Sequence, residues 1–87
     1  MARHPEKEAQ RLLKAFAVLV RNTTWKCGRV ERQVVNYLRA KITKFGSVET
    51  PIKEMLIHFG LSGKKKSEFF DSLRRLEKRR IIKIEKL

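Results

Sequence analysis

Eight polar residues between positions 64 and 78 have the types and spacing of a surface that binds phosphate groups and base edges. Three consecutive lysines open the segment, and two consecutive arginines begin eight residues after the last of them. Lysine contacts phosphate as a flexible point charge, whereas the planar guanidinium of arginine can bind a guanine edge through two hydrogen bonds. The candidate binding residues are Lys64, Lys65, Lys66, Ser67, Asp71, Arg74, Arg75 and Lys78.

These residues have distinct expected roles. Lysines 64–66 are expected to contact phosphates, and Arg74 and Arg75 to contact guanine edges or phosphates. Ser67 suits either target, and Asp71 could accept from cytosine or orient a neighbouring arginine. Each of the three lysines opposes the positive end of a helix dipole, by a few tenths to about 1 kcal/mol, so helix stability does not explain them. A phosphate at that helix N-terminus would be attracted by the dipole, the free N–H groups and the lysines together, which predicts an anion site there.

The overall composition also favours a polyanionic partner. The 87 residues include 22 Lys and Arg against 9 Asp and Glu, giving a net charge of +13 at pH 7. Self-repulsion at this charge destabilises a small folded domain, and an anionic ligand relieves it. We expect duplex DNA as the partner, with RNA as the alternative. A chain of this length forms one modest core and has no room for a deep substrate cavity.

The residue patterns of other functional classes are missing from the sequence. We find no phosphate-cradling glycine-rich loop and no catalytic Ser-His-Asp or Cys-His order, and so expect no enzymatic activity and no cofactor. The single cysteine, Cys27, cannot form an internal disulfide, and it does not stand at zinc-ligand spacing from the two histidines, so we expect no metal site. The apolar run AFAVLV is too short for a membrane span or a signal peptide. We therefore expect an intracellular protein, cytoplasmic and associated with the nucleoid, that does not enter a membrane.

Apolar residues at helical spacing predict four helices, over about residues 5–21, 29–45, 51–59 and 64–80. Gly46 and Gly60 are expected to end the second and third helices. Thr50 and Pro51 suit the N-cap and the first helical position of the third.

Strand signals are weaker. Residues 47–49 predict a very short strand, and β-branched residues predict a C-terminal strand over residues 81–84. In the last helix, Phe69, Leu73 and Leu76 form the inward face, and stepping about 100° per residue from it places Lys64, Ser67, Asp71, Arg74, Arg75 and Lys78 on the outward side.

The first predicted helix has an apolar stripe wider than one packing face requires. Residues 15–20 read AFAVLV, in which Val18 and Leu19 widen the stripe. The extra width could be buried in the domain's own core or against a second copy of the chain. We predict an N-terminal amphipathic helix within residues 1–22 that forms a homodimer, and a nucleic-acid-binding domain over residues 23–87.

Two further features lie near the second helix. Its polar side carries a secondary basic face of Arg29, Arg32 and Arg39, for which ordinary solvation is the simpler interpretation. Trp25 lies in the connector before this helix. A tryptophan in such a connector is expected to cap the core, and stacking on a base is the alternative.

The element order over residues 29–87 resembles the winged-helix variant of the helix-turn-helix family. The resemblance is carried by IKEMLIHFGLS, residues 52–62, and FFDSLRRLEKRRIIKI, residues 69–84. It implies a mainly α fold: a winged helix-turn-helix with an extra N-terminal amphipathic helix and a minimal two-stranded β element. It also implies that residues 64–80 form a recognition helix in the DNA major groove.

Two departures from the family pattern concern the turn and the wing. A short insertion lies between Gly60 and Phe69, within SGKKKSE, at the position of the three lysines. Arg80 stands where the family has a glycine before the strand, and no second strand follows Leu87. We therefore expect a wing that is truncated or absent.

Together these features predict a double-stranded DNA-binding protein, either a small transcriptional regulator or an architectural protein. An RNA- or ribosome-associated winged-helix protein and a protein-interaction module remain the alternatives.

Overall fold

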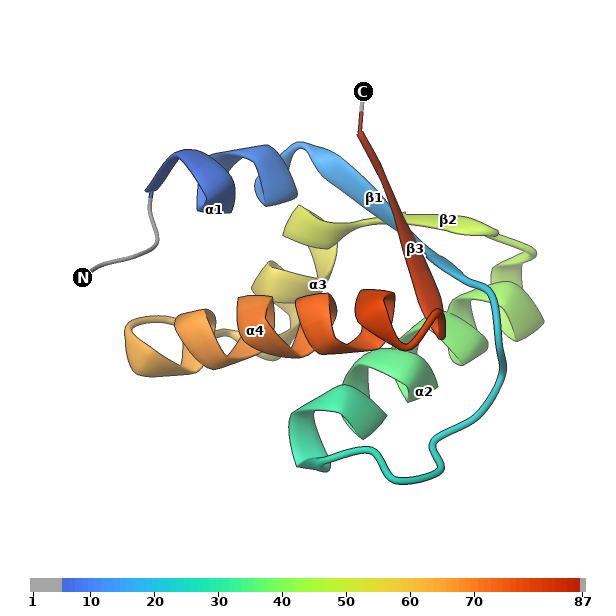
Figure 1. Cartoon of the computed structure of the whole chain (residues 1–87). Helices are drawn as coiled ribbons and strands as arrows, with labels where there is room; N and C mark the ends of the chain where they lie inside the picture. The colour runs from blue at the N-terminus through green and yellow to red at the C-terminus, as the bar shows by residue number, and fades with distance from the viewer. Residues whose placement is uncertain (1–5, 87) are drawn as a thin grey trace.

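Four helices and one three-stranded antiparallel sheet make up residues 6–86, the part of the chain that the computed structural model describes (Figure 1). The predicted mainly α class is confirmed, with a larger sheet than expected. The elements in chain order are α1 (Glu6–Leu13), β1 (Ala15–Leu19), α2 (Arg29–Phe45), β2 (Glu49–Pro51), α3 (Ile52–Phe59), α4 (Lys64–Lys78) and β3 (Ile82–Lys86).

Strand β1 is the centre of the sheet, whose strand order is β2-β1-β3. Ala17 lies opposite Thr50 in β2 and opposite Ile84 in β3. Directly opposed residues point to the same face of a sheet. Ala17 and Thr50 are buried and Ile84 packs against the core, so this face is the one that meets the helices.

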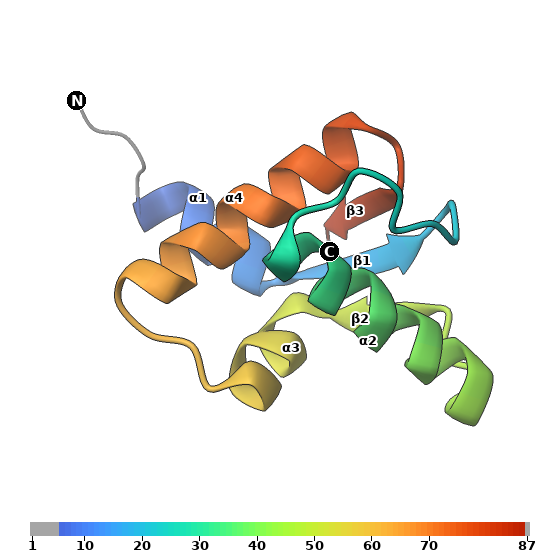
Figure 2. The same ribbon diagram turned by 90° about the horizontal axis from the view of Figure 1, so that it is seen from below.

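Helices α2 and α4 pack against each other and against the sheet, α2 contacting β1 and α4 contacting β3. Figure 2 shows both helices in front of the sheet when the molecule is seen from below. The predicted inward face of α4 is confirmed, since Phe69, Leu73 and Leu76 are all fully buried. The other large side chains that are fully buried are Val34, Val35, Leu38, Ile52, Met55, Ile81 and Ile82.

The predicted helix over residues 5–21 is wrong beyond Leu13, because residues 15–19 form strand β1. The run AFAVL satisfies both helical and alternating periods, so the sequence alone does not decide between them. The tertiary structure decides: strands on both sides hydrogen-bond to β1, and Ala15 and Ala17 are buried against the helices. Residues 1–5 and 87, including the predicted start of the helix, lie outside the described residues.

This change affects two further predictions. The two-stranded β element is wrong, because β1 makes the sheet three-stranded. The segment that was to supply the dimer interface is the middle strand of the domain's own sheet, so the argument for a homodimer through an N-terminal helix loses its basis. The domain boundary expected at residue 22 would also separate β1 in the sequence from β2 and β3, the two strands with which it pairs.

Small shifts occur at the start of α3. The short strand lies at Glu49–Pro51 rather than at residues 47–49, and helix α3 starts at Ile52. Thr50 is therefore a buried strand residue and not an N-cap, and Pro51 lies just before the helix. At the other ends, Gly46 and Gly60 close α2 and α3 in the left-handed conformation, with φ of 66° and 62°, as predicted.

Helix α4 ends in a Schellman motif built around Arg80. The Arg80 N–H donates to the Glu77 carbonyl at 2.9 Å, and the Ile81 N–H donates to the Leu76 carbonyl at 3.0 Å. Arg80 has a φ of 62°, in the left-handed region that favours glycine. The winged-helix pattern has a glycine at this position, and Arg80 adopts the backbone conformation that a glycine would adopt there.

Candidate nucleic-acid interface

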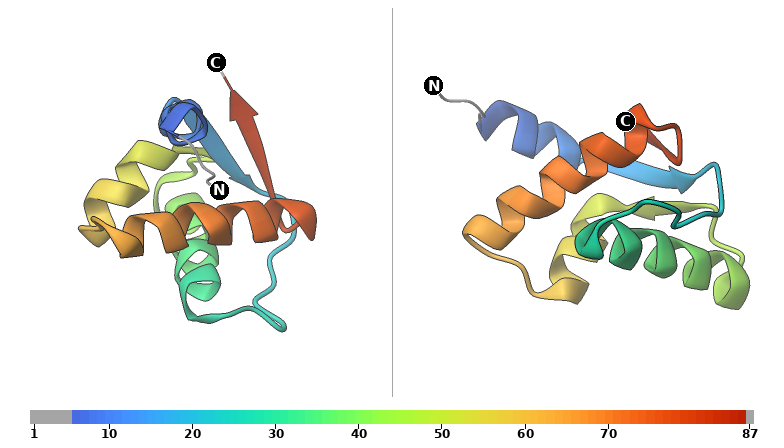
Figure 3. Two further views of the ribbon diagram at one scale, coloured as in Figure 1. Left: turned by 60° about the vertical axis from the view of Figure 1, so that its left-hand side comes forward. Right: turned by 60° about the horizontal axis from the view of Figure 1, so that its bottom comes forward.

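The exposed side of α4 carries most of the predicted binding residues. With Phe69, Leu73 and Leu76 buried against the core, the helical repeat turns the opposite side to solvent. In both views of Figure 3 the N-terminal end of α4 lies at one side of the fold, next to the end of α3. Lys66 is half-buried, and the exposed members of the set are Lys64, Lys65, Ser67, Asp71, Arg74, Arg75 and Lys78.

Lys64, Lys65 and Lys66 occupy the first turn of α4, and we call them the N-terminal lysines. Gly63 stands at the N-cap and offers no side-chain cap, and no acidic residue lies in the first turn. Their side chains make no ion pair with another described residue. The positive end of the helix dipole and three ammonium groups therefore lie together without a compensating carboxylate in that turn.

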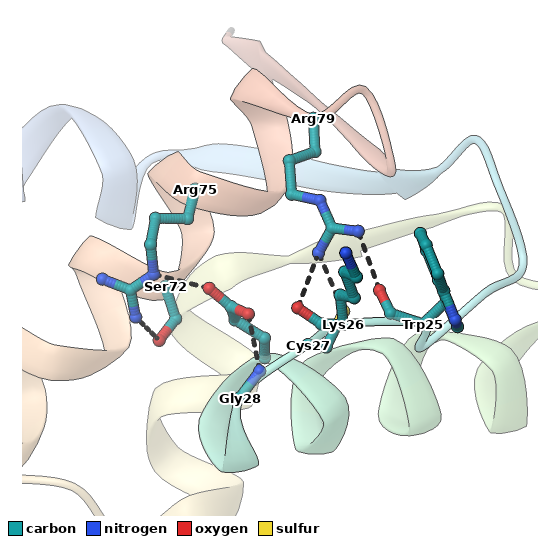
Figure 4. A network of polar contacts seen from close by, with 8 residues as sticks. Trp25, Lys26, Cys27, Gly28, Ser72, Arg75 and Arg79 are labelled. Atoms are coloured by element: carbon teal, nitrogen blue, oxygen red, sulfur yellow. Dashed lines mark hydrogen bonds and ion pairs between the residues drawn. The ribbon is translucent and has the colours of Figure 1, made fainter.

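Arg75 has a structural role that the sequence did not indicate. Its Nε donates to Glu31 Oε2, and its Nη2 donates to the buried Ser72 hydroxyl at 3.0 Å (Figure 4). Glu31 is buried at the start of α2, where its Oε1 accepts the Gly28 backbone N–H at 2.8 Å. Arg75 therefore ties α4 to the N-terminus of α2, and its Nε and Nη2 already donate hydrogen bonds within the protein.

The titration of Glu31 reflects this pairing. Burial raises the pKa of the Glu31 carboxyl, but the hydrogen bonds from Arg75 and Gly28 and the charges of Arg75 and Arg79 outweigh it. The net result is a pKa below the ordinary value of 4.5. Glu31 is thus ionised at neutral pH in the folded protein.

Arg79 fixes the β1–α2 connector, residues 20–28, against the C-terminal end of α4. Its Nη2 donates to the Trp25 carbonyl at 2.7 Å, and its Nη1 donates to the Lys26 carbonyl at 3.2 Å and to Cys27 Sγ at 3.5 Å (Figure 4). These bonds cross more than fifty positions of sequence. Arg79 was not among the predicted binding residues, and the sequence could not place the carbonyl groups that it binds.

A basic hollow lies between this connector and the last two turns of α4. Its volume is about 440 Å³, and it is lined by Lys26, Glu31, Arg75, Lys78 and Arg79. Four cations thus surround one carboxylate, and that carboxylate is already paired with Arg75. The hollow joins the exposed side of α4 through Arg75 and Lys78. Lys26 was missed by the sequence analysis, because only the tertiary structure brings the connector to α4.

A smaller hollow of about 100 Å³ lies where α4 meets α1 and β3. Its charged lining residues are Arg11, Arg74, Glu77 and Lys86. Arg74 is exposed and also has an interaction within the protein. Cations from α1 and β3 therefore accompany α4 on this side, and neither Arg11 nor Lys86 was among the predicted binding residues.

The predicted secondary face of α2 is only partly available. Arg29 and Arg32 are exposed, whereas Arg39 is half-buried and its Nε donates to Asn22 Oδ1 at 2.7 Å. Arg39 therefore holds the start of the connector in place. Glu31, which lies between Arg29 and Arg32, was not among the predicted residues. Its position three residues after the N-cap Gly28 is that of the acidic residue of a capping box.

The aromatic side chains of Tyr37 and Trp25 differ in their surroundings. The Tyr37 hydroxyl donates to Glu54 Oε2 at 2.6 Å, and its ring packs on His58 and Phe59. Burial and the Glu54 carboxylate raise the pKa of Tyr37 to about 12. Trp25, in contrast, is 69% exposed, so the expectation that it caps the core is wrong.

Comparisons of the chain with protein-family models, with curated proteins and with solved structures found no match in any of the three. No helix within residues 6–86 has the length and apolar character needed to cross a membrane. Over the same residues, no group of three or more His, Cys, Asp or Glu side chains could hold a metal ion.

Proposed function

We propose that the protein binds double-stranded DNA through α4, as a small transcriptional regulator or an architectural protein. The observation that carries the proposal is the N-terminal end of α4, where three lysines and the helix dipole meet without a carboxylate in the same turn. Without an anion these positive groups repel one another, and a docked phosphate would be attracted by all of them.

The surroundings of α4 support the same proposal. The basic hollow lies on one side of the helix, and the smaller hollow with Arg11 and Lys86 lies on the other. From Lys64 to Lys78 the helix rises about 21 Å. An exposed helix of this length with cations along both flanks suits a major groove lined by two phosphate backbones.

The element order adds a further argument. Helix α2, strand β2, helices α3 and α4 and strand β3 follow the order of the winged-helix pattern. β1 pairs with β3 in antiparallel fashion, as the strand after a wing would, but it comes from the N-terminal side of the chain. The DNA contacts that a wing makes in winged-helix proteins would then be made here by α1 and the end of β3.

The test is a binding titration of the full chain with duplex DNA, single-stranded DNA and structured RNA across a salt series. We expect a preference for the duplex and a steep fall of log affinity with log salt. Equal affinity for all three would reduce the interaction to general attraction between polyelectrolytes, and a preference for RNA would replace DNA as the partner. Weak affinity for all three would favour a protein-interaction module.

Base reading is tested separately with Arg74→Ala. We expect this substitution to relax any preference among duplex sequences, at about 1–3 kcal/mol for a specific base contact. Lys65→Ala should instead weaken binding to all sequences to a similar degree and lower the salt slope by about one unit. An unchanged preference in Arg74→Ala would remove that residue from base recognition.

A further inference from the structure

Trp25, the only tryptophan of the chain, is presented to solvent by a connector that is itself held in place. Its backbone N–H donates to Thr23 Oγ1 at 3.1 Å, and its carbonyl accepts from Arg79 at 2.7 Å. The next residue, Lys26, has a φ of 57°, which is unfavourable for a side chain larger than glycine. The exposed indole therefore stands on a fixed backbone conformation and does not belong to the core.

The surroundings of the indole are cationic. Lys26 Nζ lies 4.7 Å from the centre of the ring, a cation–π contact. Lys26 and Arg79, which both contact Trp25, also line the basic hollow with Lys78. Figure 4 shows the indole and the Lys26 side chain next to each other beyond Arg79. An aromatic face beside several cations matches a ligand that has a flat π system and a negative charge.

We propose that Trp25 stacks on an unpaired nucleobase whose phosphates contact Lys26 and Lys78. This inference rests on the proposed nucleic-acid binding and narrows the substrate. Bases within a duplex are already stacked on their neighbours, so only a base in a single-stranded extension, a bulge or a junction can cover the indole. The preferred substrate is then a duplex on α4 with an unpaired stretch at the C-terminal end of that helix.

A protein partner is the competing explanation, because exposed tryptophans are common in protein interfaces. The charge favours the nucleotide: the basic hollow has four cations and a single carboxylate, which Arg75 already neutralises. A partner with an apolar surface would leave those cations near apolar groups, at an electrostatic cost.

The experiment compares one hairpin duplex in two forms, blunt and with a four-nucleotide single-stranded extension. Labelled-DNA anisotropy gives the affinity, and the fluorescence of the single tryptophan reports contact at the indole. We expect the full chain to bind the extended hairpin about tenfold more tightly than the blunt one, as stacking of one base allows. We also expect the extension to quench the tryptophan fluorescence.

Variants separate stacking from charge. Trp25→Ala should bind both hairpins with the affinity that the blunt hairpin has for the unsubstituted chain, and Trp25→Phe should keep part of the gain. Phe45→Ala is the matched control, because Phe45 is 71% exposed and has Lys41 Nζ 5.2 Å from its ring centre, but it lies at the end of α2. This control should keep the full tenfold gain.

Equal affinity of the full chain for the two hairpins, or a gain that survives Trp25→Ala, overturns the stacking site while duplex binding stands. Binding and quenching by a single-stranded oligonucleotide without any duplex binding would support the stacking site and overturn the proposed function. A fluorescence change that depends on protein concentration in the absence of nucleic acid would assign Trp25 to a protein interface and overturn the proposal.

Discussion

The two ends of α4 carry similar positive charge but use it in different ways. At the N-terminal end, Lys64 and Lys65 are exposed and make no ion pair with another described residue. At the C-terminal end, Arg75 binds Glu31 and Arg79 binds three groups of the β1–α2 connector. Charge on an exposed helix face is thus a weak guide to binding, and the partners that each cation already has inside the protein are a better one.

The largest effect is expected at the N-terminal end. Replacing Lys64, Lys65 and Lys66 together by alanine should weaken duplex binding about 100-fold, or about 2.7 kcal/mol, if each contacts a phosphate. The slope of log affinity against log salt should fall by up to about 2.7. The melting temperature should stay the same or rise, because each lysine opposes the helix dipole.

A control for net charge is available in three exposed lysines away from α4. Replacing them by alanine removes the same charge and should weaken binding much less than the first variant; they are Lys44, Lys53 and Lys83. Equal losses of affinity in the two triple variants would show that only the total charge matters, and would contradict a specific anion site at the start of α4.

The second effect is on stability, at the C-terminal end. Arg75→Ala leaves the buried Glu31 carboxylate with the Gly28 N–H as its one remaining hydrogen bond in the described structure. We expect a loss of about 1–2 kcal/mol at pH 7, less than for a fully buried pair because the Arg75 side chain is 58% exposed. Sequence preference in DNA binding should not change. Lys78→Ala, also exposed on α4, should stay within about 0.5 kcal/mol of the unsubstituted chain.

The pH dependence of this effect follows from the lowered pKa of Glu31. A carboxyl with a depressed folded-state pKa stabilises the protein above its unfolded value, here 4.5, and the stabilisation is lost as the pH falls through the folded value. The difference between Arg75→Ala and the unsubstituted chain should therefore shrink below pH 4.5 in urea titrations. A difference that persists unchanged at low pH would mean that packing, and not the ion pair, accounts for the loss.

Each end of α4 also has one residue with a positive φ, a glycine at one end and an arginine at the other. Gly63 has a φ of 61° and a ψ of −131°, and a Cβ added there would meet nothing within 4 Å. Gly63→Ala should therefore destabilise the protein by about 1–2 kcal/mol through backbone strain alone. Chemical denaturation measures the change, and an unaffected free energy of unfolding would mean that the turn has another accessible conformation.

The smallest effect has the opposite sign. Arg80→Gly relieves the left-handed strain at the Schellman motif and should stabilise the protein by about 0.5–1 kcal/mol, less any gain in the entropy of the unfolded chain. DNA binding should change little. A loss of stability would show that the Arg80 side chain contributes more to the fold than its backbone conformation costs.

The sequence predicted best what depends on neighbouring residues. Helix α2, the glycine ends of α2 and α3, and the buried face of α4 follow from short-range periodicity and capping. Strand β1 was missed because its run of apolar residues fits two periods, and its pairing partners lie far along the chain. The contacts around α4 were missed for the same reason, since Arg75 and its partner Glu31 are 44 positions apart. The exposure of Trp25 could not be predicted either, because no pattern among its neighbours in the sequence indicates it.

The central position of β1 determines when the sheet can be completed during synthesis. Ala15 pairs with Lys86, 71 positions later, so β1 leaves the ribosome long before its second partner exists. Contacts of such long range form slowly, because a large loop must close first. During that interval the apolar run AFAVL has an open hydrogen-bonding edge, which can pair with a strand of another chain. If residues 82–86 were lost, β1 would never gain this partner, and the middle strand of the sheet would remain an exposed edge.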